Sequence, residues 1–298
     1  MKSIYKFIAC SILTFFITSC GEDLYNTEQY KKEVYLVGGY NRVLTLDVMY
    51  NHEKVESHFT ISSSGSLPLD QDVDISLKIN NDLVDSYNKK YWGVMNLDKY
   101  YMALDQSLYS IPSLEHNTIL HANGISVNVP LFIQTEDLSP DISYVIPVQI
   151  ENTTVYPVNE NGRKMLILLN LKNGYSGNYT MDGYTTEPGK TPRKMQKPKV
   201  VTAAGINDIR IFYAINNDSK EKADIQGKTI KVSILDESIA DNQKLKKVVV
   251  AAWNPETLAV TDSGEGFYNP DTKTFHIKYT INNIVYEENL TKEKELPK

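Results

Sequence analysis

Short runs in which apolar residues occupy every second position dominate this chain. The alternation is most regular in residues 42–50 and 72–79, and it recurs in 125–131 and 144–150 with one proline in each run. A period of two is typical of a strand with one buried and one solvated face. Since proline cannot donate to a β-ladder, the two proline-containing runs are expected at a sheet edge or a bulge. The pattern predicts a mainly β protein with antiparallel sheets.

The length and a break in this pattern predict two domains. A chain of 298 residues is long for one sandwich and comfortable for two domains with separate cores. The alternation stops and restarts at the turn-like residues 173–177. We therefore predict an immunoglobulin-like or jelly-roll type sandwich over residues 33–172. A small antiparallel meander, barrel-like and partly closed, is predicted over residues 173–298.

The second domain contains several local signals. Its strands are expected at residues 179–182, 208–215, 228–235, 245–252, 257–262, 274–280 and 284–289. Asn282 and Asn283 suit a two-residue hairpin turn. Residues 186–199 are dense in Pro, Gly and Lys and are expected to form a loop. In the first domain, one helix is predicted over residues 82–91, capped by Asp82 and covering an end of the sandwich.

The N-terminus has the pattern of a bacterial lipoprotein signal. A basic start precedes the apolar residues 7–17, and Ile17-Thr18-Ser19-Cys20 has the small-residue spacing of a lipoprotein cleavage site. We predict that residues 1–19 are removed, that Cys20 is lipidated, and that residues 20–32 form a tether. The apolar run is shorter than the ~20 residues of a membrane-spanning helix, so the lipid is the only expected membrane contact.

The residues around Cys20 also bear on location and stability. Glu22 and Asp23 resemble the surface-export signal of some Gram-negative glycan-degrading bacteria, which predicts an outer-membrane lipoprotein facing the exterior. The other cysteine, Cys10, lies in the segment expected to be removed. A disulfide is therefore not expected, and the fold must depend on burial alone.

The charge composition argues against a nucleic-acid partner. The chain has a formal net charge of −6 and only four arginines. Nucleic-acid surfaces need concentrated Lys and Arg to displace counterions. Neutral or weakly charged partners fit this composition better.

The sequence contains no recognisable catalytic or metal-binding motif. The five histidines are scattered, and residues 70–74 resemble only the first half of a calcium loop, with Ile75 where a glycine is needed. A nucleophile elbow is also missing. No metal, cofactor or catalytic residue is therefore predicted. Glycoside hydrolysis needs only two carboxylates across a cleft, so this activity stays open. No particular pair is predicted, because many acidic pairs arise by chance.

Aromatic residues are the one compositional excess with a possible binding role. The chain has twenty tyrosines and two tryptophans, and Tyr91, Trp92, Tyr100 and Tyr101 gather near the end of the predicted helix. Rings with a polar edge suit sugars, whose C–H faces stack on them. We predict a carbohydrate-binding platform at these four residues. The alternative is that these rings pack the sandwich core and rim.

Several segments resemble a known family. The residues that carry the resemblance are Ile17 to Cys20, Tyr109 to Pro112, Gly124 to Ile133 and Tyr144 to Ile150. They look like the N-terminal domain of unknown function in surface lipoproteins of polysaccharide-utilisation loci. The same domain type precedes the catalytic barrel of certain endo-β-N-acetylglucosaminidases.

A second set of segments looks similar to an uncharacterised domain often paired with the first. These are Gly174 to Tyr179, Gly266 to Tyr268 and Phe275 to Tyr279. The resemblance implies a non-catalytic, glycan-binding accessory protein that acts beside an outer-membrane importer or a surface glycosidase. The catalytic barrel of the enzyme relatives is missing, so no catalytic residue is carried over.

Two other functions stay open at this point. A structural or adhesive lipoprotein such as a fimbrial subunit also combines a lipidated cysteine with two β-rich domains. No arginine lies between Cys20 and Arg42, which disfavours processing by a trypsin-like protease ahead of the first strand. A glycoside hydrolase with an unrecognised carboxylate pair is the third possibility.

Overall fold

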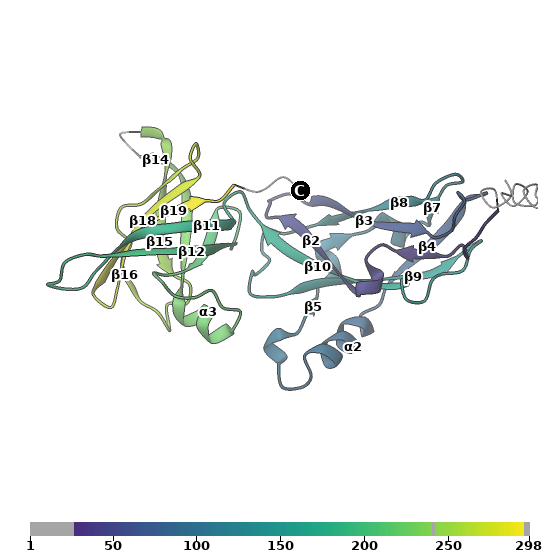
Figure 1. The fold of residues 1–298 in the computed structure, drawn as a ribbon, viewed down its shortest axis with the longest axis horizontal. Coiled ribbons are helices and arrows are strands. Elements are labelled where there is room, and N and C mark those ends of the chain that lie inside the picture. The colour runs from purple at the N-terminus through teal and green to yellow at the C-terminus, as the bar shows by residue number, and fades with distance from the viewer. Residues whose placement is uncertain (1–26, 240–241, 295–298) are drawn as a thin grey trace, which may run out of the picture.

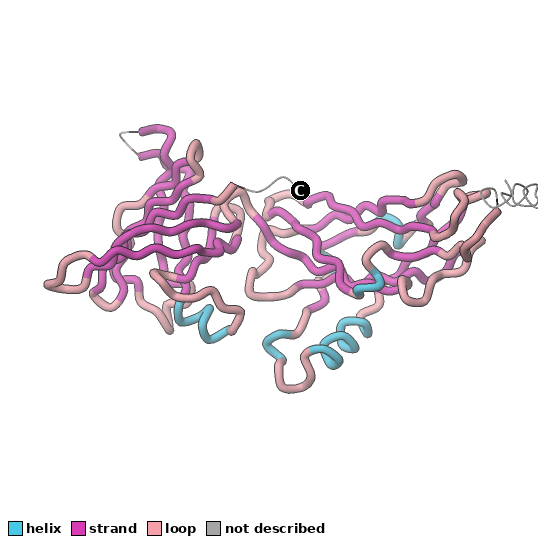
Figure 2. The backbone as a smooth tube through the Cα atoms, viewed as in Figure 1, coloured by secondary structure: helices cyan, strands magenta, loops and turns pink. Residues whose placement is uncertain are grey.

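The computed structural model describes residues 27–239 and 242–294. The predicted signal peptide, Cys20 and residues 20–26 of the predicted tether lie outside the described residues. Two β-rich parts lie end to end, and strands are the main regular structure of both (Figures 1 and 2). The mainly β class and the sandwich-then-barrel order are therefore confirmed. In the described part of the chain, no helix has the length and apolar character needed to cross a membrane.

The first part is a sandwich of two sheets. The four-stranded sheet has the order β1 (Val34–Leu36), β3 (Val55–Ser63), β8 (Ser126–Ile133) and β6 (Tyr109–Ser110). The six-stranded sheet has the order β2 (Val43–Met49), β10 (Lys164–Lys172), β9 (Tyr144–Thr153), β4 (Val73–Ile79) and β7 (Thr118–Leu120), with β5 (Met102–Ala103) paired to β9. Alternate residues of both sheets, including Phe59, Ile75 and Ile146, are buried in one hydrophobic core.

The strand with Pro147 was expected at a sheet edge or a bulge: it has a bulge, since its register with β4 shifts between Ser76 and Leu77, but the edge position is wrong. β9 lies inside its sheet, between β10 and β4. Its pairing with β4 begins at Val148, so Pro147 lies just beyond this ladder, where no N–H donor is needed on that side. The Pro147 carbonyl accepts a hydrogen bond from the Asn80 N–H at 3.0 Å.

The predicted helix is α2 (Asp82–Tyr91), with the expected bounds. Asn81 is its N-cap residue instead of Asp82, and no side chain caps it. The helix does not cover an end of the sandwich. Leu83, Val84 and Tyr87 pack on the outer face of the six-stranded sheet, where Val145 and Leu166 are buried beneath them. This placement leaves the other side of α2 facing solvent.

The second part is a closed antiparallel barrel with an added strand. The ring consists of β11 (Gly177–Thr186), β12 (Arg193–Ala203), β13 (Asp208–Phe212), β14 (Thr229–Ile239), β15 (Asn242–Ala252), β17 (Phe267–Asn269), β18 (Thr274–Ile281) and β19 (Ile284–Lys292). β19 pairs with both β18 and β11 and so closes the ring, while β16 (Val260–Asp262) pairs with β18 outside it. The short helix α3 (Lys222–Lys228) links β13 to β14.

Each strand predicted for the barrel overlaps a strand of the structure, whereas β12 and β17 were not predicted. The two-residue turn at Asn282 and Asn283 is confirmed, because both residues have positive φ and join the paired Ile281 and Ile284. The loop expected over residues 186–199 is wrong in its second half, where β12 begins at Arg193. Pairing with β11 along nine residues overrides the unfavourable strand propensity of Pro and Lys there.

A buried polar cluster lies inside the barrel. The side chains of Lys199 and Glu288 are 1% and 0% exposed, with 3.4 Å between Lys199 Nζ and Glu288 Oε2. Glu288 Oε1 accepts hydrogen bonds from the Tyr279 hydroxyl and, at 2.7 Å, from the Ala214 N–H. The Lys199 ammonium also donates to the Phe212 carbonyl. Burial lowers the pKa of Lys199 against the opposing effect of Glu288, and burial raises that of Tyr279.

Side-chain contacts join the sandwich to the barrel. Arg210 of β13 donates to Asp141, which lies between β8 and β9. The Trp253 Nε1–H donates to the other Asp141 oxygen at 3.1 Å, and the Arg210 guanidinium lies 4.8 Å from the centre of the Trp253 ring. Ala203 of β12 belongs to the sandwich core. Trp253 therefore serves as an inter-domain contact.

The end of the predicted tether is bound to the sandwich through Glu28. Its carboxylate accepts from the Ser66 N–H at 2.6 Å, from the Ser66 hydroxyl at 2.8 Å and from the Leu67 N–H at 3.2 Å. The Ser66 N–H contributes most to a lowering of the Glu28 pKa to about 2. This arrangement holds the described residues before β1 against the turn at residues 64–68.

We expect this attachment to depend on pH. A depressed folded-state pKa stabilises the attachment above the ordinary Glu value near 4.5, and the stabilisation is lost as pH falls towards 2. A carboxyl-carbon NMR titration of Glu28 should give a midpoint near 2 in the wild type. The midpoint should rise in Ser66→Ala, which removes the hydroxyl but keeps the N–H. An ordinary midpoint in the wild type would contradict this attachment.

Candidate functional site

The aromatic residues predicted to bind sugar lie in one cluster around α2, but only one is largely exposed. Tyr91, 50% exposed, has its ring centre 4.4 Å from that of Tyr87. Tyr87 also stacks on Tyr101 at 5.1 Å, and Trp92 meets Tyr101 edge-on at 6.4 Å. Tyr100 is half-buried, and its hydroxyl donates to the Gly93 carbonyl at 3.0 Å. Trp92 and Tyr101 are therefore mainly packed against neighbouring rings, while Tyr91 is half exposed and has Lys90 Nζ 5.2 Å from the centre of its ring.

The segment after α2 exposes apolar side chains. Val94 and Met95 are 75% and 89% exposed, and Leu97 and Met102 are also largely exposed. Together with Tyr91 they lie within residues 91–102, the segment that also carries most of the aromatic cluster. Exposed apolar residues that gather in this way are typical of an interaction surface.

A cavity of about 480 Å³ lies between α2, the turn before β2 and the start of β10. Tyr40, 56% exposed, and Tyr87 lie among the residues that line it. The polar lining residues are Arg42, Ser86, Lys90, Glu160, Asn161 and Lys164, and the apolar ones are Leu83, Met165 and Leu166. The volume is within the range of small-ligand sites.

The chemistry of this cavity combines aromatic faces with donors and acceptors. Burial, with a smaller contribution from Tyr101, raises the pKa of Tyr87 to about 12, so its hydroxyl keeps its proton at neutral pH. Arg42, Lys90 and Lys164 carry positive charge, and Glu160 is the one carboxylate in the lining. Such a site can stack on an apolar face of a ligand and hydrogen-bond its polar groups. Its charge excess favours a ligand with a carboxylate.

The sequence analysis found part of this site and missed the rest. It predicted the helix that carries Tyr87 but did not connect Tyr40 with it. Tyr40 belongs to the short 3₁₀ helix Gly39–Asn41, which precedes β2. The parallel pairing of β2 with β10 brings this turn next to α2. A contact between elements so far apart in the sequence leaves no local signal.

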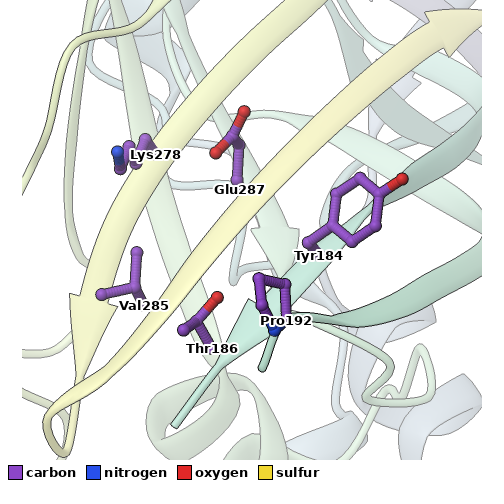
Figure 3. A pocket seen from close by; sticks show the side chains of 6 residues that line it. All are labelled: Tyr184, Thr186, Pro192, Lys278, Val285 and Glu287. Carbon is purple, nitrogen blue, oxygen red and sulfur yellow. The ribbon is translucent and has the colours of Figure 1, made fainter. Parts of the chain in front are cut away.

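A second cavity, of about 410 Å³, lies on the outside of the barrel (Figure 3). Tyr184 and Thr186 of β11, Lys278 of β18 and Glu287 of β19 line it, together with Val285 and Pro192. The sequence analysis did not identify it. Among the described residues, no group of three or more His, Cys, Asp or Glu side chains is placed to hold a metal ion.

Two family models match the chain. One, described as an N-terminal domain, matches residues 30–157, and the other, described as a C-terminal domain, matches residues 163–295. Together the two matches cover most of the chain, with one domain type following the other. The interval between the matches falls before β10, which completes the six-stranded sheet of the sandwich.

The same two-domain arrangement is found in solved structures from Bacteroides. A protein of unknown function from Bacteroides ovatus is 17% identical and has a TM-score of 0.61, with 88% of this chain and 93% of that chain covered. A multidomain protein including DUF1735, also from B. ovatus, is 18% identical with a TM-score of 0.58 and coverages of 84% and 90%.

A more distant structure carries a functional description. An auxiliary nutrient binding protein from Bacteroides thetaiotaomicron is 15% identical with a TM-score of 0.51, and 85% of this chain and 91% of that chain are covered. At such identities these likenesses establish the fold alone. Comparison with curated proteins gives no match.

Proposed function

We propose that this protein is a non-catalytic, glycan-binding accessory protein of the bacterial cell surface. The observation that carries the proposal is the cavity with Tyr40 and Tyr87 in its lining, where aromatic rings lie beside six polar side chains. Sugars present C–H faces to rings and hydroxyls to polar groups, so this combination suits them. The fold likeness to an auxiliary nutrient binding protein supports the same role.

The charges of the cavity refine the proposed ligand. Three cationic side chains face one carboxylate in the lining, so an oligosaccharide with a uronic acid should bind more tightly than its neutral counterpart. The charged groups lie at the surface, and the preference should therefore weaken as salt rises. An outer-membrane importer or a surface glycosidase of the same locus is the proposed protein partner. The exposed apolar side chains of Val94, Met95 and Leu97 are available for such a contact.

Replacing Tyr40 tests the proposed site. By analogy with base stacking on aromatic side chains, Tyr40→Ala should weaken binding of an oligogalacturonide about ten-fold or more. The ring is more than half exposed, so the melting temperature should stay near that of the wild type. Isothermal titration calorimetry measures the affinity. Tyr30→Ala, at an exposed tyrosine outside both cavities, is the matched control.

Three results of this experiment separate the alternatives. Unchanged affinity in Tyr40→Ala would exclude this cavity as the sugar site. Failure of the wild-type protein to bind any member of a broad glycan array would exclude the function itself. Turnover of a bound glycan would show that the protein is an enzyme.

The lipid anchor is tested separately. We propose that lipid on Cys20 holds the protein in the outer membrane with its domains facing outward. Cys20→Ala should therefore remove fatty-acid labelling and release the protein from the membrane fraction. Glu22→Ala with Asp23→Ala should keep the labelling but reduce the accessibility of the protein to external protease. Normal labelling of Cys20→Ala would contradict the anchor.

A further inference from the structure

The outer face of β11, β19 and β18 presents a regular row of polar and aromatic side chains. Tyr184 pairs with Glu287 across β11 and β19, and Glu287 pairs with Lys278 across β19 and β18. Gly183 and Glu288, the sequence neighbours of Tyr184 and Glu287, are buried in the barrel. Because successive side chains of a strand point to opposite faces, the row itself faces outward. With two interstrand gaps, the row spans roughly 10 Å.

The row forms one side of the second cavity. Tyr184 is 50% exposed and presents a free ring face, while Thr186 and Val285 form the next pair along the strands. Figure 3 shows Pro192 beside Thr186, at the point where the chain enters β12. The cavity therefore has an aromatic wall, hydrogen-bonding groups and an apolar base, the same combination as the proposed site on the sandwich.

The neighbouring row extends this face beyond the cavity. His276 Nδ1 lies 2.8 Å from Asn289 Oδ1, and its ring stacks on Phe267 with centres 5.2 Å apart. His276 Nε2 lies 3.9 Å from Glu287 Oε1, so the two rows are in contact. Aromatic rings are thus present at both sides of the face, with donors and acceptors between them.

The charges on this face favour an uncharged ligand. Lys278 and Glu287 adjoin in one row and are the one cation and the one carboxylate of the cavity lining, so the lining has no excess of either sign. This balance differs from the cationic excess of the cavity on the sandwich. A neutral, extended ligand with many hydroxyl groups fits the row better than a nucleic acid or another polyanion.

We propose that the outer face of β11, β19 and β18 is a second carbohydrate-binding site, which takes a neutral oligosaccharide. The Tyr184 ring stacks on a sugar C–H face, and Lys278, Glu287 and Thr186 bond its hydroxyls. The ligand class rests on the proposed function, whereas the site itself is independent of the sandwich cavity. Two sites on one chain would increase the avidity for a polysaccharide that reaches both.

Calorimetric titration of the full mature chain with cellohexaose, xylohexaose and mannohexaose tests this proposal. Tyr184→Ala should weaken binding at one site about ten-fold or more, and Tyr184→Phe, which keeps the ring, should retain most of the affinity. Lys278→Ala should also weaken binding. The melting temperature verifies that each variant is folded, and Tyr30→Ala again serves as the control.

The outcomes separate this proposal from the proposed function. Loss of binding in Tyr184→Ala while Tyr40→Ala retains it would support the barrel site. Wild-type affinity in both Tyr184→Ala and Lys278→Ala, with binding lost in Tyr40→Ala, would overturn the barrel site and leave the function standing. If the wild type binds none of these probes but binds an oligogalacturonide, the neutral-ligand site is overturned. Binding to no glycan at all overturns both.

Discussion

Lys199→Met should destabilise the protein by about 3–5 kcal/mol, the usual cost of breaking a buried ion pair by removing one partner. Lys199 and Glu288 are almost completely inaccessible to solvent inside the barrel. Without the ammonium, the Glu288 carboxylate keeps only neutral donors, the Tyr279 hydroxyl and the Ala214 N–H. A carboxylate left in this position is either charged without compensation or protonated at a cost.

Urea unfolding, followed by circular dichroism, measures this effect. Lys194→Met is the matched control, because Lys194 lies on the same strand with an exposed side chain. The double variant Lys199→Met with Glu288→Gln should recover much of the loss, since no buried charge is then left unpaired. A Lys199→Met variant as stable as the control would mean that the ammonium is not buried in solution.

This pair also shows why the second domain was only partly predictable. In the sequence, Lys199 belongs to a stretch rich in Lys and Pro, which is typical of a solvated loop. Closure of the ring by β19 places Glu288 against it, and the partner lies 89 positions away. By contrast, the turn at Asn282 and Asn283 depends on two adjacent residues, so its local signal was sufficient.

At the candidate site, too, local patterns were predictable and contacts between distant segments were not. The helix Asp82–Tyr91 and its aromatic residues were predictable, because helical spacing is a local pattern. The exposure of each ring was not predictable, since it depends on which side of the helix packs on the sheet. Trp92 and Tyr101 contact other rings, whereas Tyr40 lines the cavity. To predict the row of side chains around Tyr184, the register of three paired strands must be known. The alternation within a single strand does not contain this information.

The second large effect is expected at the contact between the domains. Arg210 is 7% exposed, and its guanidinium lies between Asp141 of the sandwich and the Trp253 ring. Arg210→Ala removes the charged hydrogen bond and the cation–π contact, and it leaves Asp141 with the Trp253 N–H. Asp141 is partly exposed and can rehydrate, so the expected loss is about 1–3 kcal/mol.

Calorimetry should also show how strongly the domains are coupled. Each domain has its own hydrophobic core, yet Ala203 of the barrel packs into the sandwich core. Weakening the contact should therefore separate the unfolding of the sandwich from that of the barrel, giving two transitions or a broader one in Arg210→Ala. Lys231→Ala is the control, because Lys231 is the cross-strand neighbour of Arg210 on β14 and its side chain is 39% exposed.

The same contact determines what an isolated sandwich can do. A fragment of residues 33–172 retains Asp141 but loses Arg210, Trp253 and the Ala203 side chain from its core. It should fold, because its two sheets enclose most of that core, but with a lower melting temperature than the sandwich has in the full chain. If Arg210→Ala instead unfolds in one sharp transition with unchanged midpoint, Arg210 does not couple the domains. The remaining contacts, such as Ala203 in the sandwich core, would then hold the domains together.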